Sequence, residues 1–350
     1  GSDVDIKDNF SKNNINFFYY PLNLDFNLIE DLYTLISLIK LILKCSPDIV
    51  HTFDTKPNIY GRLAAWLCRV KIIIGTQPGV GMVFSKYNPR FGKVVTYIFS
   101  ILLKFICKIS DLTIYQNKSD WQLMLAKKIV NHANSSIIIS SGVDTKFYNY
   151  PDVSRLKPSF SKKEKINIIF IGRLLVSKGI IYFCNLAKNI RLKYPNIFFT
   201  VVGEIPISSP DKVDDNILKN YSNYVRHIKK VPNVKKVLTQ SDLIVFPSFY
   251  TEGVPRVLLE ASSMSLPIVA FDNPGSDEAV INKFNGYLVP KGDLRSLEDS
   301  VLKILRNKTK YNRFSKNSRL LAIKNFDISD VAKQYKIVYK KFNLNYNKRK

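Results

Sequence analysis

The sequence is poor in the residues that build disulfide frames and metal sites. It holds 4 cysteines and 3 histidines in 350 residues, and no two cysteines form a C-x-x-C pair. The cysteines at positions 45, 68, 107 and 184 all lie in apolar surroundings. We therefore expect reduced cysteines in the core of a cytoplasmic protein. The histidines are too scattered to predict a metal cluster.

The sequence also lacks a hydrophobic run long enough to cross a membrane. The longest apolar run, Val94 to Ile109, contains Lys104 and Lys108 and falls short of the roughly 20 residues that a spanning helix needs. No secretory signal peptide is recognisable. A run of this kind can still lie on a membrane surface without crossing it.

Acidic residues are scarce compared with basic ones. Lys and Arg number 53 against 28 Asp and Glu, a formal net charge of +25. A surface this basic attracts polyanions, namely nucleic acid, anionic lipid or phosphorylated substrates. The sequence has no zinc-ligand pattern, no RNP-like aromatic strand motif and no isolated recognition helix, and the charge is spread over both halves. We therefore expect no nucleic-acid partner, although tight and salt-sensitive DNA binding would revive that alternative.

Strands and helices alternate in two halves, which predicts an α/β fold with two parallel sheets flanked by helices. Hydrophobic residues make up 46% of the chain, enough for two cores. The expected strands cover residues 15–20, 48–52, 71–76, 111–115 and 137–140, then 166–171, 197–202, 242–247, 267–271 and 286–290. The expected helices cover residues 28–45, 57–68 and 180–194, and a further helix has Pro255 at its first position.

A polar stretch rich in Pro, Ser and Lys divides the chain. We expect a first domain over residues 1–150, a linker over 151–165, a second domain over 166–326, and a C-terminal helix with a basic tail over 327–350 that packs back toward the first domain. Two such domains make a cleft, and ligands of open α/β sheets bind at the carboxyl ends of the strands.

Two carboxylates flank the expected start of a helix in the second half. In the segment Thr251-Glu252-Gly253-Val254-Pro255-Arg256-Val257-Leu258-Leu259-Glu260, the first lies in a loop after a strand and the second inside the helix. A helix start offers unpaired N–H groups that suit phosphate, and carboxylates beside it can accept hydrogen bonds from sugar hydroxyls. The alternative is the ordinary acidity of helix N-termini.

Two cations follow the first strand of the same half. The segment Gly172-Arg173-Leu174-Leu175-Val176-Ser177-Lys178-Gly179 places Arg173 and Lys178 between a strand and a helix, where they can neutralise a diphosphate. An ordinary surface loop is the alternative.

These segments, with Phe246-Pro247-Ser248 and Asn285-Gly286-Tyr287-Leu288-Val289-Pro290, resemble glycosyltransferase family 4. The resemblance implies the GT-B fold, in which two Rossmann-like parallel-sheet domains face a central cleft, and retention of anomeric configuration. It implies catalytic roles for Arg173, Lys178 and Glu252. The donor-binding residues that it implies are Gly172, Arg173, Lys178, Glu252, Gly253, Val254, Arg256, Val257 and Glu260, with Glu252 on the transferred sugar and Glu260 on the ribose.

The first half narrows the resemblance to bacterial enzymes that build capsule, O-antigen or glycoprotein glycans. It is carried by His51-Thr52-Phe53-Asp54-Thr55-Lys56-Pro57-Asn58-Ile59-Tyr60-Gly61, Thr76-Gln77-Pro78-Gly79-Val80-Gly81-Met82-Val83-Phe84-Ser85, Gln116-Asn117-Lys118-Ser119-Asp120 and Ser141-Gly142-Val143-Asp144. It implies a UDP-sugar donor, a UDP-N-acetylhexosamine or a relative of one, and a polyprenyl-diphosphate-linked saccharide acceptor. The acceptor-side candidates are His51, Lys56, Gly79 and Gly81, with a structural role as the alternative for His51.

A lipid-linked acceptor implies a peripheral position on the inner face of the cytoplasmic membrane. Aromatic and basic residues are interleaved from Phe84 to Ile109, which suits an anionic membrane surface; a core helix with basic flanks is the alternative. No D-x-D metal motif stands at a convincing site, since Asp3-Val4-Asp5 lies at the very start of the chain. We therefore expect a metal-independent transferase without a cofactor.

Members of the family begin with a strand, a glycine-containing loop and a helix ahead of the segment that opens this chain. We expect that piece to be absent, which would leave one edge of the first sheet bare. A catalytically inactive GT-B protein that binds nucleotide-sugar without transfer therefore stays an alternative, as does a nucleotide-sugar epimerase with the same fold.

Overall fold

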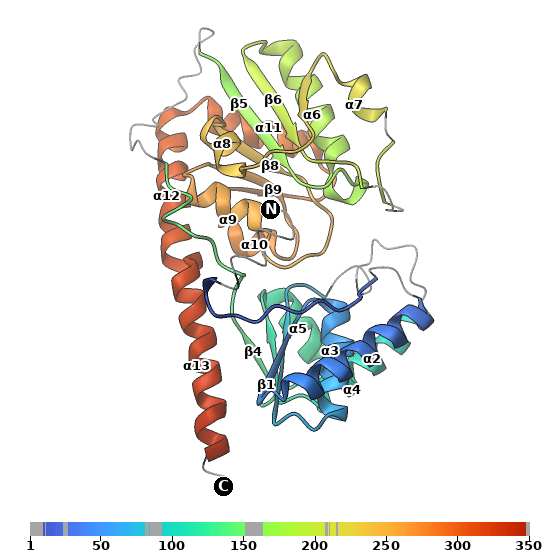
Figure 1. The fold of residues 1–350 in the computed structure, drawn as a ribbon. Coiled ribbons are helices and arrows are strands. Elements are labelled where there is room, and N and C mark those ends of the chain that lie inside the picture. Colours follow the sequence, from blue (N-terminus) through green and yellow to red (C-terminus); the bar gives the residue numbers. More distant parts are fainter. Residues whose placement is uncertain are drawn as a thin grey trace.

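The computed structural model describes residues 10, 12–23, 27–80, 84, 93–150, 164–206, 209, 211–214 and 216–347. These residues fold into two parallel-sheet domains, and two long helices at the end of the chain run beside both domains (Figure 1). The strand order is β1-β2-β3-β4 in the first sheet and β10-β9-β8-β5-β6-β7 in the second. The predicted α/β class with two parallel sheets is confirmed.

The strands of the N-terminal sheet are β1 (Ile49–Phe53), β2 (Ile72–Gln77), β3 (Leu112–Tyr115) and β4 (Ser135–Ile137). Its helices are α2 (Leu28–Cys45), α3 (Thr55–Leu67), α4 (Lys93–Lys108) and α5 (Lys118–Ala126). Helix α2 covers the predicted range because both of its ends are coded locally. Asn27 caps the N-terminus by accepting the N–H groups of Ile29 and Glu30, and Ser46 ends the helix in a left-handed conformation before Pro47.

Two strand predictions in this domain are wrong. Residues 15–20 form no regular strand and pair with no described strand. Two contacts anchor this segment instead: Phe10 stacks on Phe17, and the Thr34 hydroxyl donates a hydrogen bond to the Pro21 carbonyl. The strand predicted over 137–140 lies two to three residues earlier, at 135–137. Its pairing with β3 ends at Ile137, opposite Tyr115, and the chain then turns away at Ser140, whose φ is +66°.

The strands of the C-terminal sheet are β5 (Ile166–Ile171), β6 (Ile197–Val202), β7 (Val225–Ile228), β8 (Leu243–Phe246), β9 (Ile268–Phe271) and β10 (Gly286–Val289). Its helices are η2 (Val176–Lys178), α6 (Ile180–Lys193), α7 (Ile217–Asn220), α8 (Val234–Thr239), α9 (Arg256–Ser263), α10 (Ser276–Ala279) and α11 (Leu294–Leu305). The central strands β8 and β9 are apolar throughout because helices bury both faces, whereas the edge strand β7 carries Arg226 and His227. In β5, Ile168 and Phe170 join one core and Ile169 joins the core on the opposite face.

The last two helices connect the domains. Helix α12 (Lys308–Phe326) packs on the C-terminal domain, and α13 (Ile328–Asn347) places Val331, Tyr335 and Tyr339 against the N-terminal sheet (Figure 1). At the junction, Val143 N–H donates to Phe326 O at 2.8 Å and Ile328 N–H donates to Val143 O at 3.0 Å. The segment that leaves the N-terminal domain is thereby tied to the bend between α12 and α13.

Candidate active site

A cavity of about 590 Å³ lies between the two domains. It opens at the carboxyl ends of β1, β2 and β8, where ligands of parallel sheets bind. The residues that line it come from both domains and from α13: Phe53, Asp54, Thr55, Pro78, Gly79, Gln116, Ser141, Tyr250, Thr251, Glu252, Gly253, Val254, Pro255, Arg256 and Tyr335.

Glycines let the two domains approach each other at this cavity. A Cβ added to Gly253 would lie 1.8 Å from the Pro78 carbonyl oxygen, and one added to Gly79 would lie 2.6 Å from the Gly253 nitrogen. Gly275, whose φ is +88°, packs against the Gly253 carbonyl from the other side. Any larger residue at these positions would force the loops apart, so the glycines fix the width of the cavity.

Glu252 and Lys178 form an ion pair beside the cavity. Lys178 Nζ donates to Glu252 Oε1 at 2.5 Å, with the lysine side chain 9% exposed and the glutamate 25%. The ammonium group also lies 4.8 Å from the centre of the Tyr250 ring, a cation–π contact. A cation and a carboxylate from different loops are therefore held at one point, where a ligand can exchange for either partner.

Glu260 is buried on α9, where its carboxylate faces one cation and one hydroxyl. Burial raises its pKa, while Arg256, 3.9 Å away, and a hydrogen bond from the Tyr148 hydroxyl act in the opposite direction. Tyr148 itself is fixed by its carbonyl, which accepts hydrogen bonds from Ser263 Oγ and Arg319 Nη1. Glu260 is therefore a positioned acceptor for hydrogen bonds.

The remaining donor-side candidates take different positions. Gly253, Val254 and Arg256 line the cavity, whereas Gly172 and Val257 do not. Arg173 is exposed and hydrogen-bonds Tyr250. Pro255 is the N-cap of α9, and the first helical residue is Arg256, because Pro255 has an extended ψ of 120°. The prediction of Pro255 at the first helical position is wrong by one residue.

His51 does not line the cavity. Its ring nitrogens contact Tyr339 Oη at 2.6 Å and Thr76 Oγ1 at 2.8 Å, and its ring stacks on Phe53. Burial, with a contribution from the Arg62 charge, lowers the pKa of His51 to about 4. The structural alternative fits its position, because the imidazole joins β1 to α13.

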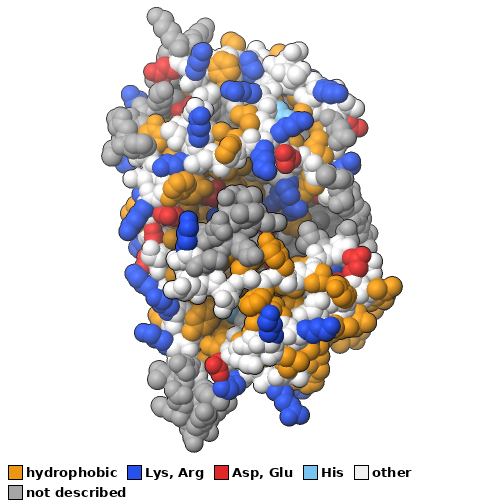
Figure 2. All heavy atoms as spheres, in the orientation of Figure 1, with side chains coloured by type: hydrophobic (Ala, Val, Ile, Leu, Met, Phe, Trp, Pro, Cys, Tyr) orange, Lys and Arg blue, Asp and Glu red, His pale blue; other side chains and the backbone are white. Residues whose placement is uncertain are grey.

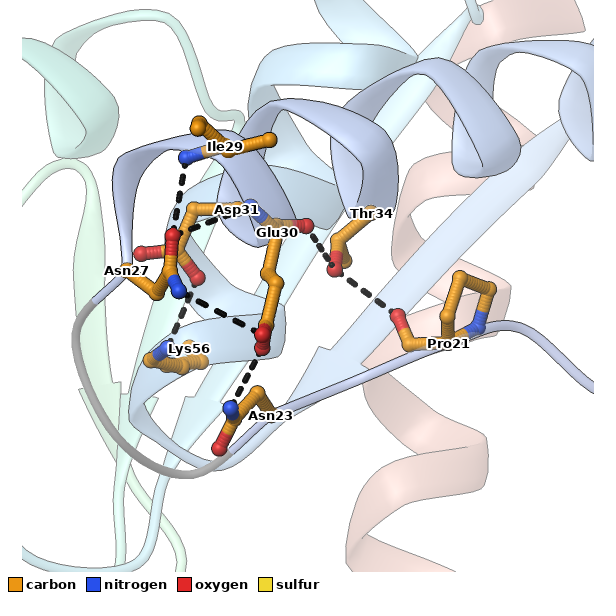
Figure 3. A network of polar contacts seen from close by, with 8 residues as sticks. All are labelled: Pro21, Asn23, Asn27, Ile29, Glu30, Asp31, Thr34 and Lys56. Atoms are coloured by element: carbon orange, nitrogen blue, oxygen red, sulfur yellow. Dashed lines mark hydrogen bonds and ion pairs between the residues drawn. The ribbon is translucent and has the colours of Figure 1, made fainter.

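Lys56 does not reach the cavity either. It is buried in an ion pair with Asp31 of α2, Nζ to Oδ1 2.7 Å, in a polar network that also orders the start of that helix (Figure 3). The acceptor-side role of Lys56 stays a prediction, and the ion pair favours a structural role because the side chain turns toward α2. Gly79 does line the cavity, and Gly81 lies outside the described residues.

Ten of the lining residues were not among the predicted site residues, and three of them show what signal the sequence offers. Asp54 follows β1 directly, so its place at a strand's carboxyl end was a usable signal. Gln116 follows β3 in the same way. Tyr335 comes from α13, and nothing local in that helix indicates that one of its tyrosines reaches the cleft.

The domains also meet through a small polar contact at the start of α5. The Lys118 N–H donates to Glu278 Oε1 at 2.9 Å, and Ser119 Oγ donates to Asp277 Oδ2 at 3.3 Å. Two acidic side chains of α10 thus face the N-terminus of a helix in the other domain, a favourable electrostatic arrangement.

In the part of the chain that the structure describes, no group of three or more His, Cys, Asp or Glu side chains is placed to hold a metal ion. The D-x-D pattern at Asp3 and Asp5 lies outside the described residues.

Comparison with known families gives a match for each domain. Residues 154–321 match the family described as "Glycosyl transferases group 1", and residues 4–117 match "Glycosyl transferase 4-like". The chain is a glycosyltransferase with a 4-like domain followed by a group 1 domain. This assignment confirms the predicted resemblance and makes the protein a transferase enzyme.

Two bacterial relatives align over most of the chain. An Escherichia coli UDP-Gal:alpha-D-GlcNAc-diphosphoundecaprenol alpha-1,3-galactosyltransferase is 29% identical over 328 residues, 92% of this chain and 83% of the relative. A Campylobacter jejuni N,N'-diacetylbacillosaminyl-diphospho-undecaprenol alpha-1,3-N-acetylgalactosaminyltransferase is 24% identical, covering 86% of this chain and 79% of the relative.

Among solved structures, Anabaena HepE in complex with UDP-glucose superimposes with a TM-score of 0.75 over 97% of this chain and 90% of that chain. The two sequences are 16% identical, so the similarity concerns the fold. It supports the GT-B arrangement of two Rossmann-like domains around a cleft.

Proposed function

We propose that this glycosyltransferase moves a sugar from a UDP-sugar to a polyprenyl-diphosphate-linked saccharide in surface polysaccharide assembly. The observation that carries the proposal is the interdomain cavity, which gathers Glu252, Gly253 and Arg256 at the start of α9, with Lys178 paired to Glu252. The HepE structure with bound UDP-glucose and the lipid-linked acceptors in the names of the relatives support this donor and this acceptor.

The proposed chemistry relies on placement and charge. The bond between the sugar's C1 and the diphosphate oxygen breaks while the acceptor oxygen bonds to C1 on the same face, which retains the anomeric configuration. The acceptor's proton passes to the leaving phosphate oxygen. Arg173, Lys178 and the N–H groups at the start of α9 stabilise the charge that grows on the diphosphate. Since these groups are cationic or N–H donors, we propose that turnover needs no metal ion, and loss of activity in EDTA would contradict this.

The donor site is tested by calorimetric titration with UDP, UDP-GlcNAc and UDP-GalNAc. We expect wild-type binding that Glu260→Ala weakens. Glu298→Ala is the matched control, because this carboxylate lies on α11 of the same domain and pairs with Lys193 rather than standing on α9. Equal binding by Glu260→Ala and wild type would refute the assignment. Binding of nucleotide-sugar without turnover would favour the inactive alternative.

We further propose that the N-terminal domain docks on an anionic membrane. Helix α4 buries Phe99, Leu103 and Ile106 but exposes a second apolar face, in which Ile98 is 60% and Ile101 is 53% exposed. Exposed apolar residues continue over α2 and the end of α3, and Figure 2 shows hydrophobic side chains gathered over this part of the N-terminal domain. No helix of the described residues is long and apolar enough to cross a bilayer.

The charge of these helices favours an anionic lipid surface as the occupant. Lys40 and Lys44 on α2 and Lys104 and Lys108 on α4 are all exposed. Basic groups around an apolar face add electrostatic attraction to the burial of apolar area in the interface. Of the segment predicted for this role, Lys86, Tyr87, Arg90 and Phe91 lie outside the described residues.

Vesicle flotation tests this docking. We expect the protein to float with vesicles that contain anionic lipid, and an Ile98→Ser/Ile101→Ser double variant to stay in solution. Leu192→Ser is the control, because Leu192 is an exposed apolar residue on α6 of the other domain. Flotation that is equal with zwitterionic and anionic vesicles would contradict the proposal.

A further inference from the structure

Asp54 has an unusual backbone conformation at the wall of the cavity. Its φ is 75° and its ψ is 168°, a region that only glycine adopts without strain. Ser46 also has a positive φ, but its φ of 44° and ψ of 52° lie in the left-handed helical region, which short polar residues tolerate. A non-glycine residue at 54 is therefore an outlier, and outliers of this kind concentrate at binding and active sites.

The surrounding structure forces the chain to turn within this one residue. Strand β1 pairs with β2 up to Phe53, opposite Thr76, and helix α3 already begins at Thr55. The Thr55 N–H donates to Asp54 Oδ1 at 2.7 Å and holds the carboxylate at the helix start. Glycine would make the same turn without strain, so the turn itself does not explain the aspartate.

The aspartate side chain has a defined setting. It is exposed and lines the cavity in the N-terminal domain, while the Glu252–Gly253 loop forms part of the wall in the other domain. Phe53 and Tyr335 line the same cavity, with ring centres 6.3 Å apart. The Tyr335 hydroxyl is fixed by Gln116 Nε2, which donates to it at 3.2 Å. An exposed carboxylate next to two aromatic rings offers a polar anchor and an apolar surface side by side.

A saccharide has the matching chemistry. Its hydroxyl groups donate hydrogen bonds, and carboxylates accept such bonds strongly because they are charged. Its ring carbons present C–H groups that pack on apolar surfaces. The donor-side carboxylates Glu252 and Glu260 belong to the other domain, so a carboxylate at position 54 is available to a second substrate.

We propose that Asp54 is the acceptor-binding carboxylate of this transferase. It accepts a hydrogen bond from an acceptor hydroxyl beside the attacking one and so aims the attacking oxygen at the donor sugar, while Phe53 and Tyr335 cover one face of the acceptor ring. The inference rests on the proposed transfer between a UDP-sugar and a lipid-linked saccharide. It concerns placement of the acceptor alone, and the proton still passes to the leaving phosphate.

Two substitutions test the role of Asp54. Asp54→Asn keeps the size and the helix cap but removes the charge. Asp54→Gly removes the side chain and relieves the backbone. Asp48→Asn is the matched control, because this exposed carboxylate stands just before the opposite end of the same strand, paired with Lys71.

The kinetic assay follows transfer to GlcNAc-diphosphoundecaprenol at saturating UDP-sugar, and calorimetry gives the dissociation constant of UDP. We expect Asp54→Asn and Asp54→Gly to lower kcat/KM for the acceptor by about ten- to hundredfold, the loss of one hydrogen bond to a charged group. We expect UDP affinity to stay within about twofold of wild type, because the donor is held by the other domain. The thermal midpoint of Asp54→Gly should equal or exceed that of wild type.

Several results would overturn the inference. Acceptor kinetics of Asp54→Asn equal to those of Asp48→Asn would show that the charge has no role. A thermal midpoint of Asp54→Gly below wild type would show that Asp54 serves the turn itself. Wild-type hydrolysis of UDP-sugar without transfer to this acceptor would refute the acceptor site and leave the donor chemistry standing. Failure of the wild type to bind any UDP compound would instead refute the proposed function.

Discussion

The buried ion pair between Asp31 and Lys56 separates a structural role for Lys56 from an acceptor-binding one. Their side chains are 6% and 8% exposed, and the two atoms Nζ and Oδ1 lie 2.7 Å apart. Tyr60 adds a hydrogen bond to Asp31; burial first, then this bond and the Asp31 charge raise the pKa of Tyr60 to about 12. Single replacements at either position should therefore destabilise the N-terminal domain.

The magnitude follows from the charge that each variant leaves behind. Removing one member of a buried pair costs about 3–5 kcal/mol, whereas replacing both by apolar residues is often neutral. Lys56→Met leaves Asp31 with the Tyr60 hydroxyl, so we expect a loss near 3 kcal/mol, roughly the low end of that range. Asp31→Leu removes the counter-charge of a buried ammonium group, so we expect about 5 kcal/mol. The double variant should lie within about 1 kcal/mol of wild type.

Tryptophan fluorescence makes the assay specific for this domain. The chain has two tryptophans, Trp66 on α3 and Trp121 on α5, and both belong to the N-terminal domain. In urea unfolding, a loss of 3–5 kcal/mol shifts the midpoint by roughly 2 M. Lys71→Met is the control, because it breaks the exposed pair with Asp48, which should contribute less than about 1 kcal/mol.

One outcome would refute the structural assignment of Lys56. If Lys56→Met unfolds at the wild-type midpoint but no longer transfers sugar, the lysine acts on substrate and the buried pair contributes nothing. If the single variants are destabilised and the double variant is restored in both stability and activity, the pair is structural. The double variant decides the question because it lacks the lysine but should still fold.

Three further predictions concern other parts of the site. The folded pKa of His51, about 4, lies below its unfolded value of 6.5. The stability that neutral His51 contributes is therefore full above pH 6.5 and is lost as the pH falls toward 4, by up to about 3 kcal/mol. In urea unfolding at pH 7 and pH 4.5, His51→Gln should lose less stability between the two pH values than wild type does. Tyr148→Phe removes the hydroxyl that hydrogen-bonds Glu260 and should weaken UDP binding by about tenfold, so an unchanged calorimetric dissociation constant would contradict that coupling. Gly253→Ala places a Cβ 1.8 Å from the Pro78 oxygen and should cut turnover by about a hundredfold while widening the cleft in small-angle scattering; full turnover would show that the domains need not approach this closely.

Five of the six strands of the C-terminal sheet could be predicted closely, whereas β7 (Val225–Ile228) was missed. Strands β5 and β6 have the predicted bounds, because each is a mostly apolar run that is followed directly by a glycine, Gly172 or Gly203. Residues 15–20 show the limit of the same reasoning. They are mostly apolar, but a strand also needs a partner, and pairing is not encoded in the segment itself.

The candidate site was predictable where its residues are close in sequence. Glu252, Gly253 and Arg256 occupy one loop and the helix start that follows, so their position relative to each other is set locally. Their pairing with Lys178 joins two loops of the same domain, which the order of strands along a parallel sheet brings together.

Local sequence patterns predicted the α/β class, the two parallel-sheet domains and the loop that carries Glu252, because periodicity and turn residues act over a few positions. Only long-range packing settles where the side chains of His51, Lys56 and Asp54 lie, although all three residues fall within six positions. His51 turns toward α13, Lys56 toward α2 and Asp54 toward the cleft. The direction of each side chain depends on which distant helix covers it, and that is settled only when the whole chain packs.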